Sequence, residues 1–577
     1  MKRYAPYAAF VVGIAVIVAL IPLFNAAQPA GIRLTRGDVI PIADAAARSV
    51  GIPVDQTWAV LSWQPSYRLH KQLDPTPDLA RRANADPVLG PRLRQYMRRY
   101  YRYNYAKFPA YGYVMVDGET GDVLSAVLSL RNEEGGGKPT ADQLRPRADA
   151  FVHSRNFPGA PNPVFESARP TEYRSRTDWT FRYRVKSGVP IGNVVPYLCV
   201  QFVGDKFAGW RLDDEYADGS AYVGENSDIG GIIARYAAFF ALLLILLTIF
   251  LKKYHAGEAG VGTASILFAV VAVLWIAADW MMGPSAVEGS NTGSLDAPTT
   301  ALVYMIFIFL LYDIILAVLA FFAWSVGESY ARERWGERLA SFDAFLRRDP
   351  LNATTGRSAL VGFLCAPAVA AGAFAIGAIP LAFHLVHVSI GVGTDTQLDL
   401  GGPWLLILFC LIDAIVFPLI ALFLLAWTHR RRVLPIGIVA TLAMGIMGAV
   451  CDVPTDPFLH RVIFDIGGMA VAIAVFIAYD LLAMSISLFL GGMITLAAPL
   501  LSVVEGHQFS QLMTTMVAPS LLVLIFAVAA LASRREVVYT YEDLAPHVRR
   551  IVERERVKAE IDAANRIQAA LLPIESP

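Results

Sequence analysis

Long apolar runs constrain this chain of 577 residues more than any other feature. An α-helix rises about 1.5 Å per residue, so a run of about 20 apolar residues crosses the roughly 30 Å hydrocarbon core of a bilayer. Apolar residues make up 55% of the sequence and charged residues only 17%, which is too apolar for an ordinary soluble protein. The runs lie at 6–24, 233–251, 262–283, 300–325, 358–386, 403–427, 433–450 and 512–532, with a double-length run at 462–505 that divides near Tyr479 and Asp480. We therefore expect a polytopic all-α membrane bundle of about ten transmembrane helices.

The first run has two interpretations, a signal peptide or a retained anchor. It follows Lys2 and Arg3, as either would. However, the run is long for a signal peptide, and Asn25-Ala26-Ala27 makes a poor cleavage site. We expect residues 1–25 to be an uncleaved transmembrane helix.

Basic residues between the runs predict the orientation. Cytoplasmic connections of membrane proteins are enriched in Lys and Arg. The alternate connections that a cytoplasmic N-terminus would place inside hold four basic clusters, whereas the short outer connections, 284–299, 387–402, 451–461 and 504–511, hold Arg461 alone. The clusters are Lys252-Lys253, then Arg332, Arg334, Arg338, Arg347 and Arg348, then Arg430-Arg431-Arg432, and Arg534-Arg535. This pattern predicts a multi-pass membrane protein with an extracytoplasmic domain at 26–232, nine further helices at 233–533 and a cytoplasmic segment at 534–577.

The sequence of the outer domain predicts an α+β fold. Two strand-like segments, 111–116 and 122–130, flank a short glycine-containing loop. Thr140 and Gln143 form a capping box that opens a helix ending near Ser154. Residues 179–185 alternate aromatic or apolar with polar side chains, which is typical of a strand buried on one face.

Two further features extend that prediction. A hairpin is expected to turn at Gly204-Asp205, and a helix at 39–50 precedes more strand material. This order suggests a second, divergent copy of one helix-then-strands unit, and it resembles PepSY-type domains. No Ser, His and Asp arrangement and no metal-ligand spacing is present in this domain.

Between Arg81 and Lys107, basic residues alternate irregularly with five tyrosines. The tyrosines are Tyr96, Tyr100, Tyr101, Tyr103 and Tyr105. Such a mixture suits contact with an anionic ligand or lipid headgroups. The alternative is a solvated face of a helix or strand.

Several ionisable residues lie within the apolar runs: Asp279, Asp313, His384, Asp413 and Asp480. A charged side chain at the bilayer centre costs about 2.5–3.5 kcal/mol on insertion scales, so such residues usually have a partner or a task. Asp279 and Asp480 fit a packing role. Asp313, His384 and Asp413 are candidates for an ion path, a proton relay or catalysis, with helix packing as the alternative.

The membrane part also resembles the CAAX-type intramembrane glutamic proteases. The resemblance rests on Gly327-Glu328, the stretch 451–457 and Arg461. That family uses a Glu-Glu-x-x-x-Arg signature, whereas the comparable stretch at 413–418 reads Asp-Ala-Ile-Val-Phe-Pro. The resemblance therefore implies a shared fold without the family's general-base chemistry.

The segment after Arg535 predicts a long helix. Residues 546–572 contain no glycine and are rich in Arg, Glu, Lys and Ala. Apolar and uncharged residues recur three and four apart in two registers, at Leu544, Val548 and Ile551, and at Val557, Ile561, Ala564, Gln568 and Leu571. This spacing suggests a coiled-coil stalk and a homodimer. A single amphipathic helix packed on its own protein is the alternative.

The last turns carry the most specific motif of the chain. Ile567, Gln568, Leu571, Leu572 and Pro573 form an Ile-Gln-x-x-Leu-Leu-Pro segment. This segment resembles the one that precedes the catalytic domain of PP2C-type bacterial serine phosphatases, such as sporulation protein E and the sigma-regulator phosphatases. The resemblance implies a signalling linker that ends at Pro573, a phosphatase domain beyond Pro577, and a phosphorylated anti-sigma-factor antagonist as partner. It also implies that the membrane is the inner membrane of a bacterium.

That resemblance also bounds what these residues contain. No metal-binding aspartate or Gly-Gly-Asp motif of the family can be assigned here, so we expect manganese or magnesium only in the domain that would follow, and no cofactor, catalytic residue or metal site in this segment. The formal net charge is zero, and no nucleic-acid partner is expected. A transporter is the main alternative, and an intramembrane protease is a weaker one.

Overall fold

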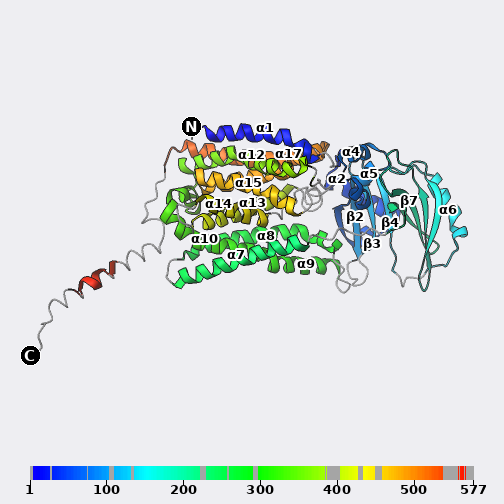
Figure 1. Cartoon of the computed structure of the whole chain (residues 1–577). Helices are drawn as coiled ribbons and strands as arrows, with labels where there is room; N and C mark the ends of the chain where they lie inside the picture. The colour runs from blue at the N-terminus through cyan, green and yellow to red at the C-terminus, as the bar shows by residue number, and fades with distance from the viewer. Residues whose placement is uncertain are drawn as a thin grey trace, which may run out of the picture.

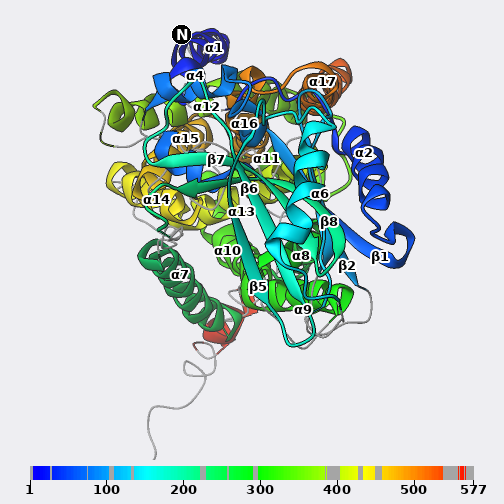
Figure 2. The ribbon, with the colours of Figure 1, turned by 90° about the vertical axis from the view of Figure 1, so that its right-hand side faces the viewer.

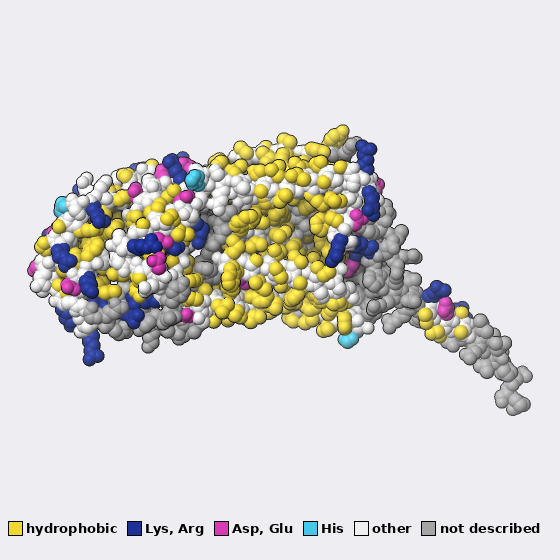
Figure 3. Space-filling model, turned by 180° about the vertical axis from the view of Figure 1, so that it is seen from behind, with side chains coloured by type: hydrophobic (Ala, Val, Ile, Leu, Met, Phe, Trp, Pro, Cys, Tyr) yellow, Lys and Arg dark blue, Asp and Glu magenta, His cyan; other side chains and the backbone are white. Residues whose placement is uncertain are grey.

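The computed structural model divides into a helical bundle and a sheet domain at one end of it (Figure 1). It describes residues 4–25, 29–73, 76–102, 110–131, 136–220, 229–255, 259–289, 296–383, 385, 403–426, 433–448, 458–536, 556, 557, 559–564 and 566. The side chains at the surface of the bundle form an apolar band between the sheet domain and an end where Lys and Arg gather (Figure 3). The chain is a membrane protein by this architecture.

The helices of the bundle match the predicted apolar runs. They are α1 (Ala5–Asn25), α7 (Ile229–His255), α8 (Val261–Gly289), α9 (Ala297–Ile308), a π-helical turn (Phe309–Asp313), α10 (Ile314–Trp335), α12 (Ala353–Ala382), α13 (Pro403–Ala426), α14 (Val433–Gly448), α15 (Phe458–Ala478), α16 (Leu481–Ala497) and α17 (Gly506–Ala532). Nine spans within the described residues are long and apolar enough to cross a membrane. The predicted span at 433–450 corresponds to α14, which at 16 residues is shorter. The count of ten crossings therefore remains a prediction.

Helix α12 lies at the centre of one half of the bundle, in contact with α1, α15, α16 and α17. Small residues allow these close contacts, as is usual between membrane helices. A Cβ atom on Gly372 would lie 2.6 Å from the carbonyl oxygen of Gly467 in α15. One on Gly13 of α1 would lie 2.6 Å from the backbone of Pro367. Helix α1 is thus packed closely against α12.

The other half of the bundle consists of α7, α8, α9 and α10, which pack with α13 (Figure 1). Its end remote from the sheet domain is held by Arg332. The guanidinium donates to Glu328 Oε1 at 2.6 and 2.9 Å and to both carboxylate oxygens of Asp343 at 2.8 and 2.9 Å. All three side chains are buried, so this cluster joins α10 to the short helix α11 (Ala340–Leu346).

The sheet domain contains one antiparallel sheet of eight strands in the order β1-β2-β3-β4-β8-β7-β6-β5. The strands are β1 (Thr57–Trp63), β2 (Gln95–Arg102), β3 (Ala110–Asp117), β4 (Val123–Leu128), β5 (Val164–Glu172), β6 (Thr177–Arg184), β7 (Val194–Val203) and β8 (Lys206–Tyr216). Helix α2 (Arg36–Ser49) precedes the first four strands and α6 (Ala141–His153) the last four. The predicted α+β fold, both hairpins and both helices are confirmed.

The domain is an internal repeat of two units, each a helix followed by four strands. Strands β4 and β8, the last of each unit, pair antiparallel, with Ala126 opposite Trp210. Both helices begin with a capping box, and each carries a proline six residues and an aspartate nine residues after its N-cap threonine. The equivalent residues are Thr35 and Thr140, Pro41 and Pro146, and Asp44 and Asp149.

The repeat extends to one buried hydrogen bond in each unit. The hydroxyl of Tyr100 on β2 donates to Asp44 at 2.8 Å, and that of Tyr183 on β6 donates to Asp149 at 2.7 Å. Burial and the nearby carboxylate raise the pKa of each tyrosine well above its usual range. These two bonds fasten α2 and α6 to the sheet at equivalent positions.

In the basic, tyrosine-rich segment, Arg81 and Arg82 are exposed, whereas most of β2 is buried rather than a solvated face. Tyr96, Tyr100 and Tyr101 are almost fully buried on β2. The arginines pair with carboxylates that are remote in sequence: Arg92 with Asp214, Arg94 with Asp117, and Arg98 with Asp44. Tyr103 and Tyr105 lie outside the described residues.

Candidate functional site

The sheet domain is attached to the bundle through backbone pairing, at a place we call the seat: residues 32–38 against 503–508. Ile32 N donates to Val503 O at 3.0 Å, and Glu505 N donates to Ile32 O at 2.7 Å. Gln508 N donates to Arg33 O at 3.3 Å, and Ile32 forms a parallel β-bridge with Val504. Backbone bonds of this kind hold two segments in register, so the sheet domain is aligned on the bundle.

Apolar packing continues across the seat. Ile32 is fully buried, and it belongs to one hydrophobic core with Leu500, Val503 and Val504. The same core reaches Leu406 and Cys410 on α13, Met493 and Ala497 on α16, and Leu512 on α17. A second contact lies on the far side of the sheet, where Val60 and Tyr101 pack with Ala301 of α9.

Helix α17 connects the seat to the opposite end of the bundle. It begins at Gly506, inside the seat, and ends at Ala532. Beyond it, Arg535 O accepts from Ala353 N at 2.8 Å, and the Arg535 side chain pairs with Asp349 at 3.1 Å. One helix thus joins the sheet domain to the point where the C-terminal segment begins.

A cleft of about 680 Å³ opens beside the seat. It is lined by residues from both parts of the molecule, among them Gly31, Asn84, Arg94, Asp117, Glu119 and Glu505. Arg94 organises its wall, because it donates to Asp117 at 3.3 Å and to the carbonyl of Asn84 at 3.2 Å and pairs with Glu119 at 2.6 Å. A ligand in this cleft would touch the sheet domain and the start of α17 together.

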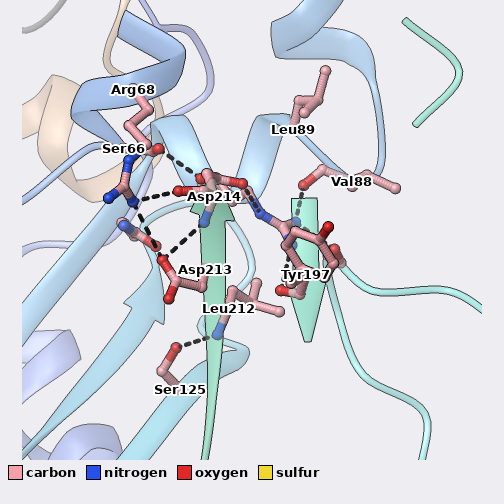
Figure 4. Close-up of polar contacts among 12 residues, drawn as sticks. Ser66, Arg68, Val88, Leu89, Ser125, Tyr197, Leu212, Asp213 and Asp214 are labelled. Atoms are coloured by element: carbon pink, nitrogen blue, oxygen red, sulfur yellow. Dashed lines mark hydrogen bonds and ion pairs between the residues drawn. The ribbon is translucent and has the colours of Figure 1, made fainter. Parts of the chain in front are cut away.

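A buried ion pair between Arg92 and Asp214 joins the two units of the sheet domain; Figure 4 shows Asp214 with Ser66 and Arg68 beside it. Arg92 Nε lies 3.0 Å from Asp214 Oδ1, and both side chains are almost fully buried. Ser66 donates to Asp214 Oδ2 at 2.6 Å. Burial raises the pKa of Asp214, and the charge of Arg92 opposes that rise. The pair crosses from the first unit to β8 of the second, so we interpret it as structural.

The structure does not bring the intramembrane candidates Asp313, Asp413 and Asp480 together in one site. Asp313 lies at the end of the π-helical turn and interacts with Asp279 of α8; both are buried. Asp413 of α13 instead lines a cavity with Asp465 of α15. Asp480 caps α16 by accepting from Ala483 N at 2.8 Å, which confirms its packing role. His384 lies outside the described residues.

Asp465 was not identified from the sequence, although it lies in an apolar run as the other candidates do. Its signal was the same, a carboxylate within a predicted span. His460 is also buried, with Nε2 2.8 Å from Gly377 O, but it lies in the predicted outer connection 451–461 rather than in an apolar run.

The C-terminal candidates are only partly described. The described residues between 556 and 566 are helical, and Ile561 and Ala564 are exposed on that helix. Ile567, Gln568, Leu571, Leu572 and Pro573 lie outside the described residues. The helical prediction is supported where it can be compared, and the coiled-coil and dimer predictions remain predictions.

Neither family models, curated proteins nor solved structures give a match to this chain. Within the described residues, no group of three or more His, Cys, Asp or Glu side chains could hold a metal ion.

Proposed function

We propose that this chain is a membrane signal-transduction protein whose sheet domain senses a condition outside the cytoplasm and passes it to the C-terminal segment through α17. The observation that carries the proposal is the seat, because the sheet domain pairs backbone to backbone with the residues that start α17. A ligand that enters the cleft beside the seat would shift the position of the sheet domain on α17 only if it binds one conformation of the seat more tightly than another.

The orientation belongs to the same proposal. The sheet domain lies at one end of the bundle, and Lys and Arg gather at the opposite end (Figure 3). Arg347 and Arg348 follow α11, and Arg534 and Arg535 follow α17. The positive-inside rule makes the basic end cytoplasmic. The C-terminal segment would then reach the cytoplasm of a bacterial cell, where a soluble effector domain would have its partners.

We further propose that the effector is a PP2C-type Ser/Thr phosphatase domain that acts on a phosphorylated anti-sigma-factor antagonist. The support is the Ile-Gln-x-x-Leu-Leu-Pro segment that ends at Pro573 and its position after a membrane exit. The domain and its manganese or magnesium would lie after Pro577. Sequencing the gene downstream of that codon tests this part: a phosphatase reading frame is expected, and a stop codon with no adjacent phosphatase gene would contradict it.

Transmission through α17 can be tested with a cross-link at the seat. In the full chain in lipid nanodiscs, Arg33→Cys and Glu505→Cys replace side chains that touch at 2.9 Å. The seat pair is oxidised first, and Val557→Cys is then labelled with a maleimide spin label, which stays attached when the seat disulfide is later reduced and reports on the C-terminal helix. We expect its mobility to differ between the oxidised and reduced states.

Two controls sharpen that experiment. Each seat cysteine alone should give no change on oxidation. Insertion of two glycines after Arg535 should abolish the difference while leaving the cross-link intact, because glycines interrupt a rigid helical connection. Identical spectra for the locked and unlocked seat would refute transmission through α17.

The dimer prediction has its own test. Cysteines placed singly at Ile561 and Leu571 should each form cross-linked dimers in membranes. Monomers at both positions would favour the alternative of one helix packed on its own chain.

A transporter is the second candidate function, because Asp413 and Asp465 line one intramembrane cavity. Ion uptake into proteoliposomes that depends on both aspartates would favour it over signalling.

A further inference from the structure

Helices α11 and α17 end beside each other. Helix α17 runs from the sheet domain to the opposite end of the bundle (Figure 1). There, Phe345 of α11 packs against Phe526 of α17, with ring centroids 5.8 Å apart. Just beyond the two helices, the side chain of Arg535 pairs with Asp349 at 3.1 Å. The residues that follow α11 and α17 therefore form one surface.

Each of these two helices is followed by an arginine in the left-handed backbone conformation. The φ angle is +61° at Arg348 and +51° at Arg534. In α11, Arg348 N donates to Phe345 O at 3.2 Å. Asp349 N donates to Ala344 O at 3.0 Å, which completes a Schellman motif, whose left-handed position is usually glycine. A side chain there brings its Cβ close to the backbone, so arginine is more strained than glycine at this position.

The neighbouring charges are already paired with each other. Asp349 pairs with Arg535, and Glu536 pairs with Arg357 at 2.7 Å. Among the described residues, no ion pair includes Arg348 or Arg534, and both residues are exposed. Their charges are therefore accessible to a ligand from outside the chain.

Apolar side chains flank the two arginines. Phe345 is 50% exposed and Leu351 55% exposed. Helix α17 exposes Ile525 and Val528 within the span that leads to Arg534. An exposed apolar face of a membrane span lies against acyl chains, and the basic residues that follow it lie at the level of the headgroups.

We propose that Arg348 and Arg534 bind the phosphate of an anionic phospholipid in the leaflet at this end of the bundle. The planar guanidinium group matches phosphate oxygens in geometry, and the apolar face of α17 accommodates an acyl chain. Two neighbouring positive charges favour a headgroup with a net negative charge over a zwitterionic one. The site requires a membrane at the basic end of the bundle, but it does not depend on the signalling role.

Native mass spectrometry of the full chain tests the site, because it counts the lipids that stay bound. We expect phosphatidylglycerol, which is anionic, to bind the wild type more tightly than zwitterionic phosphatidylcholine does. Arg348→Gln and Arg534→Gln should each raise the dissociation constant of phosphatidylglycerol about fivefold, the usual contribution of one basic residue near an anionic surface. An unchanged constant in the double variant would overturn the proposal.

The matched control is Arg174→Gln, which removes the same charge from an exposed position in the sheet domain. It should leave the binding of phosphatidylglycerol unchanged. Inorganic phosphate at the concentration of the lipid should not displace phosphatidylglycerol, because it cannot contact the apolar face of α17. Displacement by inorganic phosphate would overturn the lipid assignment in favour of a free anion.

A glycine variant separates lipid binding from a structural role, since arginine also interacts favourably with the negative end of a helix dipole. Arg348→Gly relieves the left-handed strain, so its Tm in phosphatidylcholine should equal or exceed that of the wild type while the binding of phosphatidylglycerol falls. Asn162→Gly, at φ +46° in the sheet domain, should leave binding unchanged. A lower Tm for Arg348→Gly with unchanged lipid binding would show that the arginine serves only the helix end.

Discussion

The two units of the sheet domain share a plan but differ in what they touch. Each has a capped helix, a proline at the same position and an aspartate that accepts from a tyrosine on the second strand. Only the first unit has helices α3 (Tyr67–Leu73), α4 (Pro77–Ala85) and α5 (Gly90–Leu93) between its first two strands. Only the first unit forms the seat. The features that both units share hold a helix on the sheet. The features that only the first unit has form the seat on the membrane part and line the cleft.

The largest expected loss of stability follows from removing the ion pair between the two units. Asp214→Ala leaves Arg92 buried without its partner, which typically costs about 3–5 kcal/mol. Thermal unfolding of the full chain, followed by tryptophan fluorescence, measures the loss. Asp218→Ala, in an exposed turn nearby, should change stability by less than about 0.5 kcal/mol. A small effect of Asp214→Ala would show that the two units do not depend on this pair.

The next prediction compares the repeated hydrogen bonds. Tyr100→Phe and Tyr183→Phe each remove one bond to a carboxylate, worth about 1.5–3 kcal/mol, and the two losses should be similar. Asp44→Ala should cost more than Asp149→Ala, because Asp44 pairs with the nearly buried Arg98 at 2.7 Å, whereas Asp149 pairs with the exposed Arg145 at 3.6 Å. The same unfolding measurement applies. Unequal tyrosine effects would break the equivalence of the units.

A smaller effect is expected at the seat. Gly506 has a φ of +56°, so Gly506→Ala should cost about 1 kcal/mol through backbone strain, while its new Cβ meets only an ordinary contact 3.6 Å away. Hydrogen exchange of the amides at 503–508 should become faster. Gly219→Ala imposes similar strain at φ +71° in open space, and it should leave those amides unchanged.

The smallest effect concerns Asp38 at the start of α2. Hydrogen bonds from the Thr35 side chain and backbone hold the pKa of Asp38 below its ordinary value of 3.8. A folded-state pKa below the unfolded one stabilises the fold above about pH 4, and this contribution is lost as the pH falls through the folded value. The Tm of the full chain should therefore decrease slightly as the pH falls below 4. Asp38→Asn should remove that dependence on pH.

The sequence was most informative where interactions are local. Hydropathy located the helices of the bundle, the Thr140 capping box located α6, and alternation located β6. These signals depend on neighbours within a few residues.

Long-range pairing escaped prediction for the opposite reason. Arg33 and Glu505 are 472 positions apart, and nothing local marks either as a partner. The same holds for β4 beside β8 and for Asp465 opposite Asp413. The arginines of β2 predicted an exposed surface because their carboxylate partners lie on other elements. Arg98, for example, pairs with Asp44 of α2.

The pairing of β4 with β8 has a consequence for aggregation. It places the two first strands of the units, β1 and β5, at the outer edges of the sheet, and an open edge is a template for pairing with another chain. β1 is near α8, so the membrane part shields that side. β5 is protected differently, by Pro170, a register shift near Phe165 and the charged side chains of Glu166, Arg169 and Glu172. Pairing with another chain is therefore prevented in two ways: at β1 by contact with the membrane part, and at β5 by the residues of the strand itself.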